Sequence, residues 1–360
     1  PMLSKLLNHE ASAFKQSITE EYKTVRARHE GKRAKTDWLT LDAARANKKP
    51  IDWSHYTPPK PQFIGRKTLT FDLNTLVNYI DWTPFFRAWE LAGKFPAILD
   101  DEVVGTQART LYNDAKNLLQ QIIDENLLEA QGILAFYPAN TVNHDDVVLY
   151  TDEKRNQELI RFHHLRQQNR KPPGNANKAL SDFIAPKETK LQDYIGIFAV
   201  TAGVGLNELA KEYENNHDDY NSILLKALGD RLAEASAEYL HEQVRKQYWG
   251  YASNEDFAND ALIKEKYQGI RPAPGYPACP DHTEKALLFE LLHPEDIGIS
   301  LTESMAMWPA SSVSGFYYSH PESQYFAVGK INQDQVEDYA ARKACDYDVI
   351  AKWLTSSLGF

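Results

Sequence analysis

The stretch RPAPGYPACP, residues 271–280, constrains the structure of this chain more than any other. Each of its four prolines fixes its own φ and pushes the preceding residue toward an extended conformation, so the stretch cannot be a helix. Gly275 allows close approach of the backbone, and Arg271 presents a planar guanidinium suited to a carboxylate. We therefore predict a rigid loop that forms a site for a small anionic or zwitterionic ligand. The alternative is a proline-rich connector whose arginine makes a surface ion pair.

The composition allows a sizeable core, since the chain has 360 residues of which 42% are hydrophobic. A net charge of −10 argues against broad binding to a nucleic-acid backbone. The two cysteines, Cys279 and Cys345, suggest neither a disulfide framework nor a zinc site, which favours the reducing cytoplasm. The sequence shows no signal peptide and no apolar run of membrane-spanning length, so we expect no membrane insertion. Small molecules and proteins remain as partners.

The first 64 residues differ from the rest of the chain. Charged residues crowd positions 20–35, and lysine-proline segments at 48–50 and 56–61 then interrupt regular structure. We predict a helix followed by a connecting arm over residues 1–64, and one large domain over residues 65–360. The arm is either a linker to another part of a longer protein or a plain surface segment.

Beyond the arm, hydrophobic periodicity predicts both helices and strands. Helices are expected at residues 73–91 with an interruption at Pro84, at 102–128, at 219–248, and as two short helices within 333–358. Strands are expected at 132–137, 146–150 and 195–201, and as a second strand pair at 312–318 and 325–328. Short turns between neighbouring strands favour antiparallel pairing. The predicted fold class is therefore α+β, a mainly antiparallel sheet flanked by helices.

Several familiar motifs are present only in part. Residues 203–208, GVGLNE, resemble the start of a dinucleotide-binding turn, but Glu208 stands where a third glycine would let the helix pack on the strand. An ordinary strand-to-helix turn is the better interpretation, and a Rossmann fold is not indicated. No G-x-S-x-G elbow appears, and neither cysteine lies in a nucleophile motif. Catalysis by a side-chain nucleophile is unsupported.

Residue types that bind metals gather at 144–146 (HDD), 163–164 (HH) and 217–219 (HDD). None of these groups has the paired histidines of H-E-x-x-H, and His241-Glu242 lacks the second histidine. Helix capping and surface ion pairs explain Asp218 and Asp219, which stand where the predicted helix begins and favour its positive end. We expect no metal site.

A longer pattern surrounds Arg271. Residues 271–276 resemble the R-x-x-x-G-Y element of the S-adenosylmethionine-binding activation domain of cobalamin-dependent methionine synthase. Further stretches resemble the same family in the same order: 79–86 (YIDWTPFF), 92–96 (AGKFP), 100–105 (DDEVVG), 217–220 (HDDY), 307–309 (MWP) and 312–315 (SVSG). The resemblance runs from about residue 65 to the C-terminus and implies the fold of that domain.

The resemblance also implies a set of ligand-binding residues and no catalytic side chain. Arg271 suits the carboxylate of S-adenosylmethionine, Asp81 its ammonium, and Glu234 the amine or the ribose. Main-chain groups of Ala273 and Gly275 are expected to reach the adenine. The aromatic residues expected at the ligand are Tyr276, Tyr325 and Phe326, and a ring near the sulfonium adds cation–π attraction. Asp81 could instead only cap a helix, Glu234 could be a solvated helix carboxylate, and Tyr325 could be a strand aromatic.

The implied function is reactivation of methionine synthase, a cytoplasmic methyltransferase of methionine biosynthesis. In that family, inactive cob(II)alamin is rescued by one-electron reduction coupled to methyl transfer from S-adenosylmethionine, and flavodoxin is the expected electron donor. The sequence lacks the D-x-H-x-x-G element of the cobalamin-binding module, so cobalamin is expected on a partner module of the same parent protein. The chain alone is then expected to bind without turnover. A stand-alone methyltransferase and an interaction module without ligand remain as alternatives.

Overall fold

The computed structural model describes residues 11–30 and 37–360. Contacts divide the chain into two units, residues 1–39 and residues 40–360. The first contains the charged helix α2 (Ala11–Glu30); the end of the charge-rich stretch 20–35, residues 31–35, lies outside the described residues. The predicted domain boundary at residue 64 stays a prediction. The site described below lies within the second unit.

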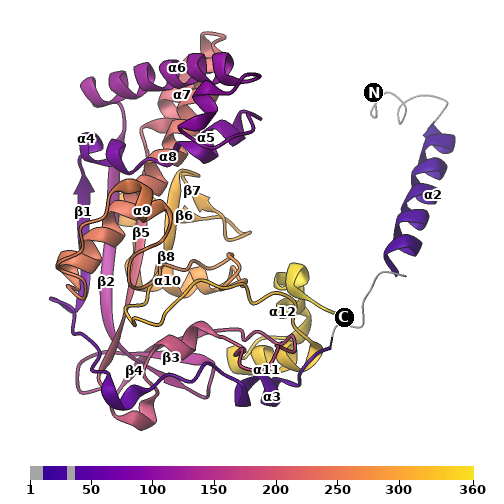
Figure 1. Ribbon diagram of the computed structural model, residues 1–360, viewed down its shortest axis with the longest axis vertical. Coiled ribbons are helices and arrows are strands. Elements are labelled where there is room, and N and C mark those ends of the chain that lie inside the picture. Colours follow the sequence, from indigo (N-terminus) through magenta and orange to yellow (C-terminus); the bar gives the residue numbers. More distant parts are fainter. Residues whose placement is uncertain (1–10, 31–36) are drawn as a thin grey trace. The chain divides into compact units, whose positions relative to one another are not determined.

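A six-stranded antiparallel sheet forms the centre of the second unit (Figure 1). The strands run in the order β4-β3-β2-β5-β8, with β1 pairing the first half of β2 and β3 its second half. This predicted antiparallel sheet, flanked by helices, is confirmed. Its strands are β1 (Gly65–Phe71), β2 (Glu129–Val142), β3 (Asp146–Tyr150), β4 (Glu158–His163), β5 (Asp193–Val204) and β8 (Ser312–Tyr317), and a separate hairpin joins β6 (Ser300–Leu301) to β7 (Met307–Trp308).

Both faces of the sheet are buried. Side chains alternate along a strand, so Leu134 and Phe136 of β2 point into one core while Ile133 and Ala135 point into another. The first core receives the apolar side of the long helix α8 (Asp219–Gln243), and the second receives α10 (Glu284–Leu292). The sheet thus lies between two helical layers, and α8 crosses the face that bears the candidate site.

Most of the predicted helices are present, with shorter bounds. The helix expected at 219–248 is α8 followed by a wider π-type turn over Val244–Tyr248. The segment 73–91 forms two short α-helices, the second of which begins two residues before Pro84. The remaining helices of this unit are α3 (Leu41–Ala46), α4 (Leu73–Leu76), α5 (Trp82–Ala88), α6 (Gly105–Asp124), α7 (Leu206–Asn215), α9 (Asn259–Ile263), α11 (Gln333–Lys343) and α12 (Tyr347–Trp353). None of the described helices is both long and apolar enough to cross a membrane.

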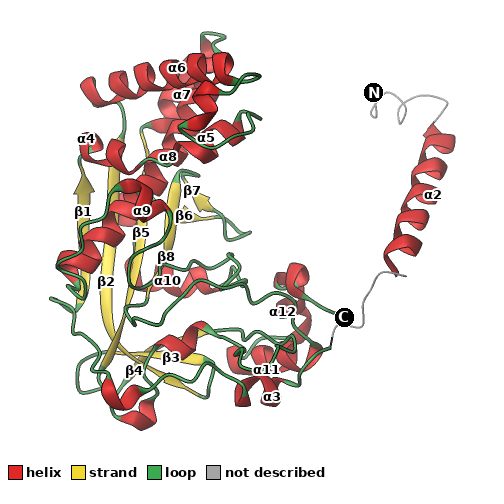
Figure 2. Cartoon of the chain, in the orientation of Figure 1, coloured by secondary structure: helices red, strands yellow, loops and turns green. Residues whose placement is uncertain are grey.

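The second predicted strand pair is wrong. Residues 325–328 form no strand, and Figure 2 shows loop between β8 and α11. The partner of β8 is β5, and its other edge is taken by the start of the proline-rich loop. Ile270 and Tyr318 exchange both backbone hydrogen bonds there, and the Phe316 N–H donates to the Pro272 carbonyl. Because that edge is already occupied, residues 325–328 cannot pair with β8 there.

The turn at residues 203–208 is an ordinary strand-to-helix connection. β5 ends at Val204, and α7 begins at Leu206. Gly205 between them has a φ of 85°, and a Cβ there would lie 2.7 Å from the Leu127 carbonyl oxygen. Glycine is required at this position by the turn itself.

The part of the arm that belongs to the second unit, residues 40–64, packs against later segments of the same unit. The indole N–H of Trp249 donates to the Pro59 carbonyl at 2.7 Å. The ring of His320 lies 4.8 Å from that of Trp53 and 4.4 Å from that of Tyr56, measured between centroids. His320 is buried, and its Nδ1 accepts a hydrogen bond from the Glu322 N–H, which requires a neutral ring.

Stability is expected to fall at acid pH through His320. Burial lowers the pKa of His320 from 6.5 to about 4, so the folded state disfavours the charged ring. The contribution of this residue is complete above pH 6.5 and is lost as the pH falls toward 4. Chemical unfolding measured across this range should show a smaller acid loss in His320→Gln than in the original protein. Parallel pH curves for the two proteins would contradict the expectation.

Candidate functional site

The proline-rich loop is held in shape by backbone hydrogen bonds. Gly275 N–H donates to the Cys279 carbonyl at 2.7 Å, and Cys279 N–H donates to the Tyr276 carbonyl at 2.9 Å. Gly275 has a φ of 92°, and a Cβ at this position would lie 2.3 Å from the His282 ring. Both the left-handed backbone and the close ring demand glycine. The predicted rigid loop is therefore present.

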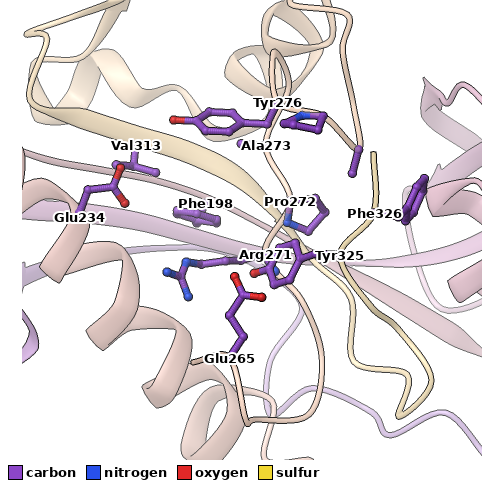
Figure 3. Close-up of a pocket in the computed structure, with 12 residues that line it drawn as sticks. Phe198, Glu234, Glu265, Arg271, Pro272, Ala273, Tyr276, Val313, Tyr325 and Phe326 are labelled. Carbon is purple, nitrogen blue, oxygen red and sulfur yellow. The ribbon is translucent and has the colours of Figure 1, made fainter. Parts of the chain in front are cut away.

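A cavity of about 500 Å³ lies beside this loop (Figure 3). Its walls come from β5, α8, β8, the segment after α9, the proline-rich loop and the irregular segment after β8. The lining residues are Phe198, Glu234, Glu265, Arg271, Pro272, Ala273, Tyr276, Pro277, Ala278, Val313, Tyr325 and Phe326. A volume of this size suits a ligand of cofactor dimensions.

A second cavity, of about 360 Å³, shares Glu234, Glu265 and Arg271 with the first. Its other lining residues include Asp81, Arg231 and Glu238. Four carboxylates and two guanidinium groups therefore surround this second cavity. The excess of negative charge favours a ligand with a net positive charge. The apolar first cavity and the acidic second cavity meet at Arg271.

Arg271 is fixed at this junction by side chains from three segments. Its Nη2 lies 2.7 Å from Glu238 Oε2, and its Nη1 donates to the Tyr267 hydroxyl at 2.9 Å. The backbone N–H of Arg271 donates to the Tyr325 hydroxyl at 2.9 Å. Burial acts to lower the pKa of the guanidinium, but attraction to Glu238 raises that pKa well above its ordinary value. Arg271 is therefore a permanent, preorganised cation and no surface ion pair.

The structure brings the predicted site residues together. Glu234, Arg271, Ala273, Tyr276, Tyr325 and Phe326 line the first cavity, and Asp81 lines the second. Gly275 lines a neighbouring cavity of about 340 Å³ on the proline-rich loop. Their individual roles toward a ligand stay predictions. In Figure 3 the Glu234 carboxylate, the Arg271 guanidinium and the Tyr276 ring all border the same space.

Other residues of the site were missed in the sequence. Glu238, Glu265, Phe198 and Val313 line the cavities, and Tyr267 supports Arg271. Glu238 follows Glu234 by one helical turn, a spacing that places both on one side of α8. That spacing was the available signal, although it also describes many solvated helix faces.

Asp81 has a structural role as well as a place in the second cavity. Its Oδ1 accepts from the Thr83 N–H at 2.9 Å, which makes Asp81 the N-cap of α5. The capping alternative is thus present in the structure. It does not decide the ligand role, because Asp81 also lines the second cavity.

Substituting Asp81 with asparagine separates the two roles. Asparagine caps a helix about as well as aspartate, so the thermal unfolding midpoint should stay unchanged. Loss of the charge should weaken binding of a cationic ligand by about tenfold, the effect of one charge-assisted hydrogen bond. Calorimetric titration with S-adenosylmethionine measures this. Unchanged affinity would mean that Asp81 only caps α5.

The motif residues with metal-ligand chemistry are engaged in other interactions. Asp145 pairs with Arg166, Asp146 with His163, and Asp218 caps α8 by accepting from the Asn221 N–H. Among residues 11–30 and 37–360, no group of three or more His, Cys, Asp or Glu side chains is arranged to hold a metal ion.

Comparisons with known proteins agree with this geometry. Residues 72–344 match the family model described as vitamin B12 dependent methionine synthase, activation domain. The chain is also similar to a solved structure titled "Crystal Structure of the MetH Reactivation Domain bound to AdoHcy". The two are 54% identical with a TM-score of 0.88, and the match covers 90% of this chain and 100% of that chain.

Proposed function

The chain belongs to the activation-domain family of vitamin B12-dependent methionine synthase, and we propose that it binds S-adenosylmethionine at the junction beside Arg271 and presents the methyl group for reactivation. It is the reactivation domain of a methyltransferase. The observation that carries the ligand proposal is that the fixed guanidinium of Arg271 lies where an apolar cavity meets an acidic one. The related solved structure, a reactivation domain bound to AdoHcy, supports the same class of ligand.

The chemistry of the ligand matches the two cavities. S-adenosylmethionine carries a carboxylate, an ammonium and a sulfonium, which give it a net positive charge. We assign the carboxylate to Arg271, the positive groups to the acidic side, and the adenine to the apolar side near Tyr276.

The role of this chain in the reaction is positioning. Cobalamin, carried by another module of the parent protein, supplies the methyl acceptor, and an electron donor such as flavodoxin supplies one electron. The cobalamin of that module would accept the methyl group as the S–CH₃ bond breaks, and S-adenosylhomocysteine would remain at the site beside Arg271. The residues around Arg271 hold the donor so that the methyl group can meet the acceptor, which makes proximity their main contribution.

A calorimetric titration tests the proposal. The chain should bind S-adenosylmethionine with one-to-one stoichiometry and should produce no methylated product without a cobalamin-bearing partner. Methyl transfer without corrinoid would support a stand-alone methyltransferase instead. Absence of any binding signal would leave an interaction module as the better interpretation.

A further inference from the structure

Glu238 stands out among the acidic residues of the site because it is buried and only one of its two carboxylate oxygens has a partner in the described part of the chain. Its side chain is 9% exposed and its Oε2 pairs with Arg271. Its other oxygen, Oε1, is buried and has no hydrogen-bond partner in the part of the chain that the structure describes. Glu238 also lines the second cavity. A buried carboxylate oxygen without a hydrogen-bond partner is energetically unfavourable. A ligand that donates a hydrogen bond to this oxygen would therefore bind more tightly.

The support around Arg271 leaves one side of its guanidinium available. Nη1 contacts the Tyr267 hydroxyl and lies 3.3 Å from His241 Nδ1. Burial holds the pKa of His241 well below its ordinary value, so the ring is neutral and can accept. Glu238 takes one donor of Nη2. The guanidinium has five N–H donors in a planar fork, so with respect to residues 11–30 and 37–360 its Nε and remaining Nη2 donors are left to receive a carboxylate.

Arg271 and Glu238 therefore present a cation and an anion side by side. An α-amino acid carries its carboxylate and its ammonium on one carbon, so the two charges of such a ligand are equally close together. Arg271 complements the carboxylate, and the free Oε1 of Glu238 complements the ammonium. Asp81, by comparison, has its Oδ1 committed to the α5 cap.

We propose that Glu238 is a specificity-determining residue that accepts a hydrogen bond from the α-ammonium of the ligand through Oε1 while it holds Arg271 through Oε2. The inference rests on the proposed function, and it adds to the predicted roles of Asp81 and Glu234 because an ammonium has three donors. Ligands that keep the amine should depend on Glu238 whether or not they keep the carboxylate.

Two further ligands separate this role from simple support of Arg271. Decarboxylated S-adenosylmethionine keeps the amine but offers Arg271 no carboxylate, and 5′-methylthioadenosine lacks both groups. Glu238→Gln should weaken S-adenosylmethionine and its decarboxylated form by about tenfold or more, and should leave 5′-methylthioadenosine unchanged. Affinities are measured by calorimetry, with thermal unfolding as the check of folding.

Glu242→Gln is the matched control. Glu242 lies one turn further along α8, is similarly buried, and bonds to Tyr79 and Lys246. The Glu242→Gln substitution removes the same charge from the same helix, so the affinities for all three ligands should stay as in the original protein. If Glu238→Gln does not fold, Glu238→Asp keeps the charge and withdraws the oxygens, and the same ligand pattern is expected.

The outcomes are distinct. If Glu238→Gln weakens S-adenosylmethionine but not the decarboxylated ligand, Glu238 only positions Arg271 and the ammonium contact is refuted. An equal loss of affinity in the Glu242→Gln control would mean that the effect comes from the net charge of the helix. That result would also refute the ammonium contact. If the original protein binds none of the ligands, it is the proposed function that fails.

Discussion

Replacing Arg271 with alanine is expected to weaken S-adenosylmethionine binding by about 2 kcal/mol or more, because the ligand carboxylate loses a charge-assisted pair. Arg271→Lys should recover only part of this, since lysine lacks the planar fork. Calorimetric titration of the three proteins measures the losses. Equal affinity in the alanine variant and the original protein would remove Arg271 from the site.

The same substitution carries a stability cost that the sequence did not indicate. Removing the guanidinium leaves Glu238 buried without its partner, and breaking a buried ion pair costs roughly 3–5 kcal/mol. Thermal unfolding should therefore show a clear loss for Arg271→Ala and a smaller one for Arg271→Lys. The double variant Arg271→Ala with Glu238→Ala removes both charges and should be more stable than Arg271→Ala alone. Binding is best compared below the unfolding range of the weakest variant.

Methyl transfer is expected only when three components are mixed: this chain with S-adenosylmethionine, a cobalamin-bearing partner module, and a low-potential electron source. Cob(II)alamin is a poor nucleophile, so reduction is required, and the bound donor must then lie within reach of cobalt. Absorption spectra should report methylcobalamin in the complete mixture and background levels when this chain is omitted.

S-adenosylhomocysteine provides the control for that experiment, because it lacks the transferable methyl group. It should occupy the site and yield no methylcobalamin. Equal methylation with and without this chain would contradict the reactivation role. Product that forms without the electron source would contradict the requirement for reduction.

Much of the fold could be predicted because its signals are local. The helix at 219–248 and the strands at 132–137, 146–150 and 195–201 follow from hydrophobic periodicity, and the rigid loop follows from its prolines. The strand at 325–328 could not be judged locally, since its existence depended on which segment would take the free edge of β8. Pairing is decided by tertiary competition, which a window of sequence does not contain.

The site residues could be predicted where a short motif dictates the contact. They were harder to predict where the contact joins segments that are distant in the sequence. Arg271 and Gly275 stand in a short motif whose backbone demands are specific. Glu238 lies 33 positions before Arg271 in the chain, and their 2.7 Å contact exists only after α8 and the proline-rich loop pack together. In the sequence, Glu238 looks like any solvated glutamate on a helix. Its role in the site becomes visible only from its burial in the structure.

The backbone bonds between the proline-rich loop and β8 have a consequence for solubility. Ile270 and Pro272 occupy the outer edge of β8, where an open strand would present unpaired groups to other chains. The loop that forms the ligand cavity therefore also covers this edge of the sheet and prevents its pairing with another chain. Substitutions that loosen this loop would expose the unpaired backbone groups of β8. The same variants should therefore both bind the ligand more weakly and aggregate more readily.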